Sequence, residues 1–152
     1  MLYYKRCSSD NKNFKELVAL LDADLALRDG DENAFYAQFN GIDALKNCVV
    51  FYSDKTLVAC GAFKEFNEDS VEIKRMFVQP DFRGKGIASK TLRVLEEWAK
   101  ELNYSYAVLE TGLRQPEAIA LYKKNNYTVI DNYPPYEEME NSVCFKKYLK
   151  PS

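Results

Sequence analysis

Apolar residues recur along the chain with two different spacings. Alternating or continuous apolar runs, rich in β-branched and aromatic residues, are typical of strands. They occupy residues 2–6, 47–52, 56–66, 71–78, 106–109, 127–130 and 142–149. Apolar residues three or four positions apart are typical of helices that bury one face. They occupy residues 14–25, 32–39, 88–102 and 118–122. The sequence therefore predicts an α+β domain.

The order of these segments predicts how the sheet is built. Short turns join the three strands between residues 47 and 78, which is typical of an antiparallel meander. A helix separates the strand of residues 71–78 from that of residues 106–109, and such a unit joins parallel strands by a right-handed crossover. We expect a mixed central sheet, an antiparallel meander followed by a parallel β-α-β crossover, flanked by helices. The chain has no repeat or linker, so residues 1–152 form one domain.

Length and charge narrow the function classes. A chain of 152 residues suits one domain with a real core. Its net charge of −2 argues against a nucleic-acid binder that acts by bulk electrostatics. No stretch approaches the ~20 apolar residues of a membrane span. The N-terminus lacks a signal-peptide core, so we expect a cytoplasmic protein that binds neither nucleic acid nor membrane.

The chain has four cysteines and no histidine. Cys7, Cys48, Cys60 and Cys144 stand singly and form no C-x-x-C pair, so we expect buried free thiols and no metal site. Without histidine, the Ser–His and Cys–His arrangements of nucleophilic catalysis are excluded. A general base must then be a carboxylate, a tyrosine, a lysine, a cysteine or water.

A basic, glycine-bearing turn, Arg83-Gly84-Lys85-Gly86, joins the strand of residues 71–78 to the helix that starts at Ile87. Free N–H groups and the positive end of the dipole favour phosphate at such a helix N-terminus. A mononucleotide P-loop would need a second glycine immediately before the lysine, and a dinucleotide fingerprint would need a glycine where Ser89 stands. Both are disfavoured, and a tight turn without a ligand stays open as the alternative.

Three motifs in their order resemble the GNAT family of acyl-CoA N-acyltransferases. They are the strand E-I-K-R-M-F-V, the turn P-x-x-R-G-x-G-I-A and the helix E-A-I-x-L-Y-K-K-x-x-Y, and the resemblance extends from Lys5 through Tyr148. Arg83-x-x-Gly86-x-Ala88 is an instance of [QR]-x-x-G-x-[GA]. The resemblance implies a GNAT-like fold and direct transfer of the acetyl group of acetyl-CoA to a primary amine, without a metal or a covalent enzyme intermediate.

The resemblance also implies where the cofactor lies. Backbone amides from Arg83 to Ala88 would wrap the pyrophosphate of coenzyme A. The pantetheine arm would run along Phe77 and Val78, in a slot between two splayed strands at residues 75–78 and 108–111. A Cβ at Gly86 should clash with the ligand or with the turn. The expected cofactor contacts are Phe77, Val78, Arg83, Gly84, Lys85, Gly86, Ile87, Ala88, Ser89, Gln115 and Tyr122. Gln115 stands where many relatives have asparagine.

Amine acetylation needs a proton acceptor and a proton donor. Glu72 occupies the strand position of a catalytic glutamate in several family members, and it would act through water. The alternatives are a solvent-facing Glu72 paired with Lys74 or Arg75, and Glu110 as the base. Tyr122 matches the tyrosine that donates to the thiolate sulfur, or is a core aromatic. Strand alternation predicts Glu72, Lys74 and Met76 on one face, opposite Ile73, Arg75 and Phe77.

The amine acceptor is the least determined part. In this fold it would meet residues 28–36 and 133–136, which mix aromatic with acidic side chains. Acidic residues suit a cationic amine but are equally typical of a solvated loop, and Arg28 could instead pair with an acceptor carboxylate. We expect a small-molecule amine, because Tyr133-Pro134-Pro135-Tyr136 resembles a loop that narrows a pocket. An amino acid, a polyamine and an aminoglycoside-like molecule all stay open as the acceptor.

Two other functions stay open for such a domain. It could bind an acyl-CoA as a sensor or scaffold without turnover, which would need only the cradle at Arg83–Ala88. It could also acetylate a protein N-terminus or a lysine, which would need an open groove. The last strand, near residues 143–148, could pair across a homodimer.

Overall fold

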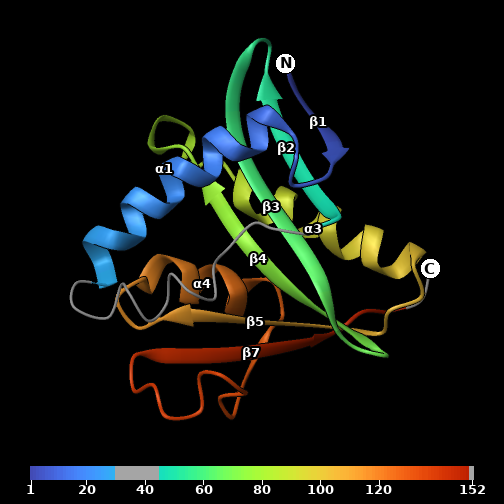
Figure 1. Cartoon of the computed structure of the whole chain (residues 1–152), viewed down its shortest axis with the longest axis vertical. Helices are drawn as coiled ribbons and strands as arrows, with labels where there is room; N and C mark the ends of the chain where they lie inside the picture. The colour runs from blue at the N-terminus through green and yellow to red at the C-terminus, as the bar shows by residue number, and fades with distance from the viewer. Residues whose placement is uncertain (30–44, 151–152) are drawn as a thin grey trace.

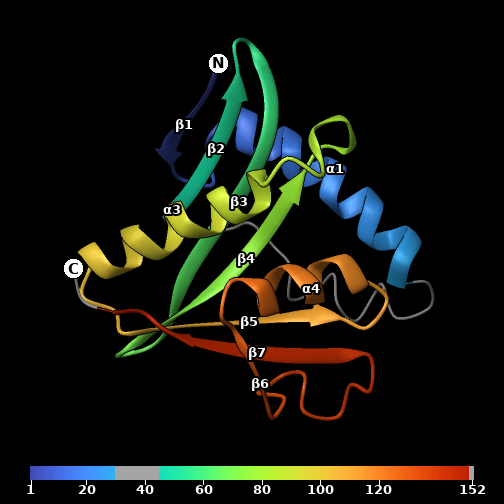
Figure 2. The same cartoon turned by 180° about the vertical axis from the view of Figure 1, so that it is seen from behind.

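The computed structural model describes residues 1–29 and 45–150, whose strands form one seven-stranded sheet (Figures 1 and 2). The strand order is β1-β2-β3-β4-β5-β7-β6. The strands are β1 Leu2–Cys7, β2 Asn47–Ser53, β3 Thr56–Asn67, β4 Ser70–Val78, β5 Tyr106–Gly112, β6 Thr128–Ile130 and β7 Ser142–Tyr148. The helices are α1 Lys12–Asp29, α3 Ile87–Glu101 and α4 Pro116–Lys124, with a short 3-10 helix at Pro80–Phe82. The helix expected at residues 32–39 lies outside the described residues.

The sheet is mixed, as the sequence predicts. Antiparallel pairing joins β1 through β4, and β4 then pairs in parallel with β5 across α3. The parallel ladder is short, because only residues 70–72 face residues 106–108. Beyond Glu72 the two strands diverge (Figure 1). Their carboxyl ends therefore leave a slot in the sheet, which confirms the expected splaying.

Helices cover both faces of the sheet. α3 and α4 lie on one face and α1 on the other, and each side has its own apolar core (Figure 2). The predicted stripe of α1 is buried at Phe14, Leu17, Val18 and Leu21. Asn11 caps this helix, since its Oδ1 accepts a hydrogen bond from Phe14 N at 3.0 Å. The amphipathic patterns thus identify the faces on which the helices pack.

A β-bulge in β4 makes the predicted alternation wrong beyond Lys74. Cys60 of β3 pairs with Phe77, but Ala62 pairs with Lys74, so β4 contains one extra residue in this stretch. The strand bends at Arg75, which has a left-handed φ of 60°. As a result Met76 packs with the α3 core, whereas Phe77 packs with the α1 core. Arg75 and Phe77 therefore share the face of Lys74.

The cysteines are free thiols, as expected. Cys48, Cys60 and Cys144 are buried, and Cys7 is partly exposed. Burial raises the pKa of Cys48 to about 12 and that of Cys144 to about 11, so both stay protonated at neutral pH. These side chains pack as small apolar groups.

β7 lies inside the sheet. All seven of its residues pair with β5, and its other side pairs with β6 along residues 144–146. The expectation that this strand pairs across a dimer is therefore wrong for that stretch, because its backbone groups are already taken. The homodimer itself stays a prediction. None of the helices in the described part of the chain is long and apolar enough to cross a membrane.

Candidate active site

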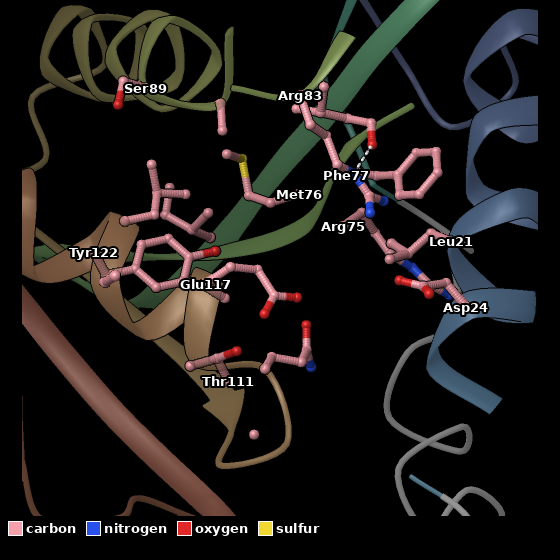
Figure 3. A pocket seen from close by; sticks show the side chains of 18 of the residues that line it. Leu21, Asp24, Arg75, Met76, Phe77, Arg83, Ser89, Thr111, Glu117 and Tyr122 are labelled. Atoms are coloured by element: carbon pink, nitrogen blue, oxygen red, sulfur yellow. Dashed lines mark hydrogen bonds between the residues drawn. The ribbon is translucent and has the colours of Figure 1, made fainter. Parts of the chain in front are cut away.

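A cleft of about 540 Å³ opens where β4 and β5 diverge (Figure 3). Its lining comes from β4, the glycine turn, the first turn of α3, the end of β5, and the facing sides of α1 and α4. Most of the predicted cofactor contacts line it: Phe77, Val78, Arg83, Gly84, Gly86, Ile87, Ala88, Ser89, Gln115 and Tyr122. The structure thus gathers residues from three sequence motifs around one cavity.

The glycine turn presents an open helix N-terminus to this cleft. Gly84 and Gly86 have left-handed φ angles of 78° and 77°, which glycine adopts without strain. The bond from Lys90 N to Gly86 O is 3.1 Å, and no described side chain caps the helix. The N–H groups of residues 87–89 therefore remain available to an anion such as a pyrophosphate.

The expected clash of a Cβ at Gly86 with the turn itself is wrong. A Cβ built there would have no heavy atom within 4 Å, and the same holds for Gly84. The space above the helix N-terminus is open. A side chain at Gly86 would therefore strain the backbone and enter the open space above the helix N-terminus, without meeting the protein.

The two basic side chains of the turn differ in position. Arg83 lines the cleft, where its Nε donates to Val78 O at 2.8 Å and its guanidinium lies 5.7 Å from the Phe77 ring centroid (Figure 3). Lys85 does not line the cleft, and its Nζ lies 5.6 Å from the Phe82 ring centroid. Arg83 thus fixes the end of β4, and the assignment of Lys85 to the cofactor has no support in the geometry.

Tyr122 is both a core aromatic and a cleft residue. Its side chain is only 6% exposed, and its ring packs 5.8 Å from that of Tyr127 and 5.9 Å from that of Phe145. Its hydroxyl points into the cleft (Figure 3). Burial, and secondarily the charge of Glu110, raise the pKa of Tyr122 above its usual value. The hydroxyl therefore keeps its proton at neutral and mildly alkaline pH.

Glu72 is buried rather than solvent-facing, with 6% of its surface exposed, and it lines the cleft. Tyr133 donates a hydrogen bond to its Oε2 at 2.9 Å, and the ammonium groups of Lys64 and Lys74 each lie 3.8 Å from Oε1. Burial and the Glu72 carboxylate raise the pKa of Tyr133, so Tyr133 remains the donor. Glu72 is thus held in a fixed orientation.

Glu110 and Tyr136 also reach the cleft. Glu110 lies at the end of β5, and its Oε2 accepts a hydrogen bond from Ser142 at 2.8 Å. Tyr136 belongs to the predicted acceptor wall of residues 133–136 and packs 5.9 Å from the Tyr133 ring. Residues 30–36 of that wall lie outside the described residues. Within the described ranges no group of three or more His, Cys, Asp or Glu side chains is placed to hold a metal ion.

Arg28 is occupied by carboxylates of the protein itself. It pairs with Asp24 of its own helix at 3.4 Å and with Glu117 of α4, which fastens α1 to α4 at the edge of the cleft. Arg114 donates to its backbone oxygen at 3.3 Å. Arg28 is therefore a poor partner for an acceptor carboxylate, contrary to one of the sequence-based possibilities.

Sequence reasoning assigns no individual role to several residues that line the cleft. Lys74 and Arg75 line the cleft from β4, Thr111 from β5 and Glu117 from α4. The K-R pair is visible in the sequence, but regular alternation would send its two side chains to opposite faces. Only the bulge, which pairing with β3 reveals, places both on one face.

The comparisons with known proteins agree with this geometry. Residues 14–127 match the acetyltransferase (GNAT) family. The chain is 40% identical over 95 residues to IAA acetyltransferase from Azospirillum brasilense, an alignment that covers 62% of each protein. The structure is similar to that of a proposed acyl-CoA N-acyltransferase from Klebsiella pneumoniae, with a TM-score of 0.82, 28% identity and 99% of each chain covered.

A second solved structure has the same fold. It is a GNAT family acetyltransferase from Elizabethkingia anophelis with acetyl-CoA bound, at a TM-score of 0.71 and 16% identity, covering 97% of this chain and 98% of that chain. The aligned segments span less than two thirds of the length of the first curated relatives, between 35% and 63%. Because the family match covers most of the described fold, the chain belongs to the GNAT family of acetyltransferases, as its three motifs predict.

Proposed function

We propose that the protein transfers the acetyl group of acetyl-CoA directly to a primary amine of a small molecule. The observation that supports this most strongly is the uncapped N-terminus of α3, which opens into the slot between β4 and β5. A pyrophosphate on the N–H groups of residues 87–89 would direct the rest of the cofactor along β4 toward Glu72 and Tyr122. A main-chain N–H near Val78 would polarise the thioester carbonyl.

The residues around the cleft suit the proton movements of this reaction. The amine nitrogen bonds to the acetyl carbon as the carbon–sulfur bond breaks, so the amine loses a proton and the thiolate gains one. In our proposal Glu72 accepts the amine proton through a water molecule, and Tyr122 donates its hydroxyl proton to the sulfur. Exchange with solvent then returns both residues to their starting states.

Release of the free thiol of coenzyme A from acetyl-CoA, followed with a panel of small primary amines, tests the proposed function. Amine-dependent release is the expected result. Binding of acetyl-CoA without release at any amine would instead indicate a sensor or scaffold. Release only with a peptide N-terminus or a peptide lysine would indicate that the acceptor is a protein.

Glu72→Gln should lower kcat/KM for the amine by about 100-fold, within the range typical of general bases. Glutamine keeps an oxygen that can accept the Tyr133 hydrogen bond, so the fold should hold. The loss should shrink at high pH, where more of the amine is already deprotonated. Glu110→Gln is the matched control, and a larger loss in that variant would assign the base to Glu110.

The kcat of the enzyme should not decrease with increasing pH below about pH 10. Tyr122 can donate only while protonated, and burial raises its pKa above the usual 10.0, so loss of the donor is displaced to higher pH. Deprotonation of the amine meanwhile raises the rate as pH increases. The measurement is kcat from about pH 7 to 10. A falling limb near pH 9 that disappears in Tyr122→Phe would contradict the protonated donor.

A further inference from the structure

Two adjacent cationic side chains lie in the wall of the cleft. The β4 bulge directs both Lys74 and Arg75 to the face that also holds Glu72, and both line the cleft. Their side chains are only 9% and 4% exposed. Arg75 is held in a left-handed backbone conformation, which is strained for a non-glycine residue. Both cationic side chains are therefore buried in the wall of the cleft.

The guanidinium of Arg75 is only partly satisfied by the protein. Its Nη1 donates to Oδ1 of Asp22 on α1 at 2.6 Å. Its Nε is buried and has no hydrogen-bond acceptor among the described residues. A buried donor without a partner is destabilising, and the fork of an arginine matches the two oxygens of a carboxylate. An anion bound in the cleft beside the guanidinium would accept a hydrogen bond from the Arg75 Nε, once the side chains around Arg75 had moved slightly.

Lys74 adds a second charge at the same place. Burial lowers its pKa, although Glu72, with Oε1 3.8 Å from its Nζ, acts in the opposite direction. Two of the other cleft carboxylates, Asp24 and Glu117, are held by Arg28. Glu72 and Asp22 are the carboxylate partners of Lys74 and Arg75. A further anion beside the two cations would stabilise their charged forms.

The position of the two cations relative to the proton-transfer groups gives the substrate class. Arg75 lies on the α1 side of the cleft and Tyr122 on the α4 side, with open space between them (Figure 3). We propose that the acceptor is an amino acid whose carboxylate binds Arg75 and Lys74, so that its amine faces Glu72 and Tyr122. This inference rests on the proposed function and specifies its acceptor.

Matched pairs of acceptors test the proposal. L-phenylalanine, L-leucine, L-lysine and β-alanine are each compared with the corresponding carboxamide, which keeps the shape and removes the charge. Thiol release is measured with saturating acetyl-CoA and expressed per unprotonated amine. In at least one pair the wild-type kcat/KM should favour the acid by about tenfold or more. Faster reaction of every carboxamide, or reaction of no amino acid in the panel, would overturn the proposal.

Variants connect this preference to Arg75. Arg75→Gln should lower the acid-to-amide ratio by about 10- to 100-fold, through KM of the acid, and leave kcat/KM of the amide nearly unchanged. Lys85→Gln removes the same charge outside the cleft and should leave the ratio unchanged. Equal losses for acid and amide would overturn the assignment.

A second variant covers the case in which Arg75→Gln does not fold. Asp22→Asn removes the carboxylate that shares the guanidinium but keeps Arg75, so the preference for the acid should be retained or increased. A ratio that falls to one in this variant would overturn the assignment. Failure of the proposed function is distinguishable from these results, because no amine, whether amino acid or carboxamide, would then release the thiol of coenzyme A, even if acetyl-CoA still bound.

Discussion

Gly86→Val is expected to weaken acetyl-CoA binding by about 100-fold, while the protein still folds. Gly86 has a φ of 77°, and a side-chain-bearing residue pays about 1–2 kcal/mol for this conformation. A β-branched valine would rotate the turn away from it and misalign the N–H groups of residues 87–89. The new side chain would also enter the open space above the helix N-terminus. The dissociation constant by calorimetry and the melting temperature are the measurements.

Lys85→Ala is the control for this variant, because Lys85 belongs to the same turn but does not line the cleft. Its dissociation constant for acetyl-CoA should stay near that of the wild type. An unchanged affinity in Gly86→Val would mean that the anion-binding site lies elsewhere.

Tyr122→Phe should lower kcat by about 100-fold, a typical contribution of a general acid, with little change in acetyl-CoA affinity. Removal of the hydroxyl leaves the ring packed against Tyr127 and Phe145, so the free energy of unfolding should change little. The effect should therefore appear in turnover and be absent from stability. Single-turnover rates and chemical denaturation measure the two quantities separately.

Tyr127→Phe is the matched control and should show the opposite pattern. The Tyr127 hydroxyl donates to buried Glu96 at 2.8 Å and does not line the cleft. Its removal leaves a buried carboxylate with one partner fewer and should cost about 1–3 kcal/mol of stability, with kcat nearly intact. Full turnover in Tyr122→Phe would leave water as the donor to the thiolate.

The parts of the site that are local in the sequence could be predicted. The turn at Arg83–Gly86 needs glycines for its left-handed angles, and the helix that follows shows its own period, so a phosphate cradle can be inferred from adjacent residues. The parallel pairing of β4 and β5 follows from the length of the crossover between them. The first feature depends on backbone rules that act within a few residues, and the second on the length of one connection.

The acceptor side could not be predicted in the same way. Whether Arg75 faces α1 or α3 depends on one extra residue in β4, and only the register with β3 defines that bulge. The occupation of Arg28 by Glu117 depends on how α1 and α4 approach each other, across a separation of 89 residues. Regular alternation and single-residue chemistry contain no information on either contact.

Calorimetric titration of the purified protein with acetyl-CoA tests the central claim most directly, with coenzyme A, ATP and NAD as comparisons. Acetyl-CoA and coenzyme A should bind at least about tenfold more tightly than the two nucleotides, because only they place a pantetheine arm in the slot between β4 and β5. No binding of acetyl-CoA, or a preference for ATP, would contradict the cradle at Arg83–Ala88 and every catalytic role derived from it.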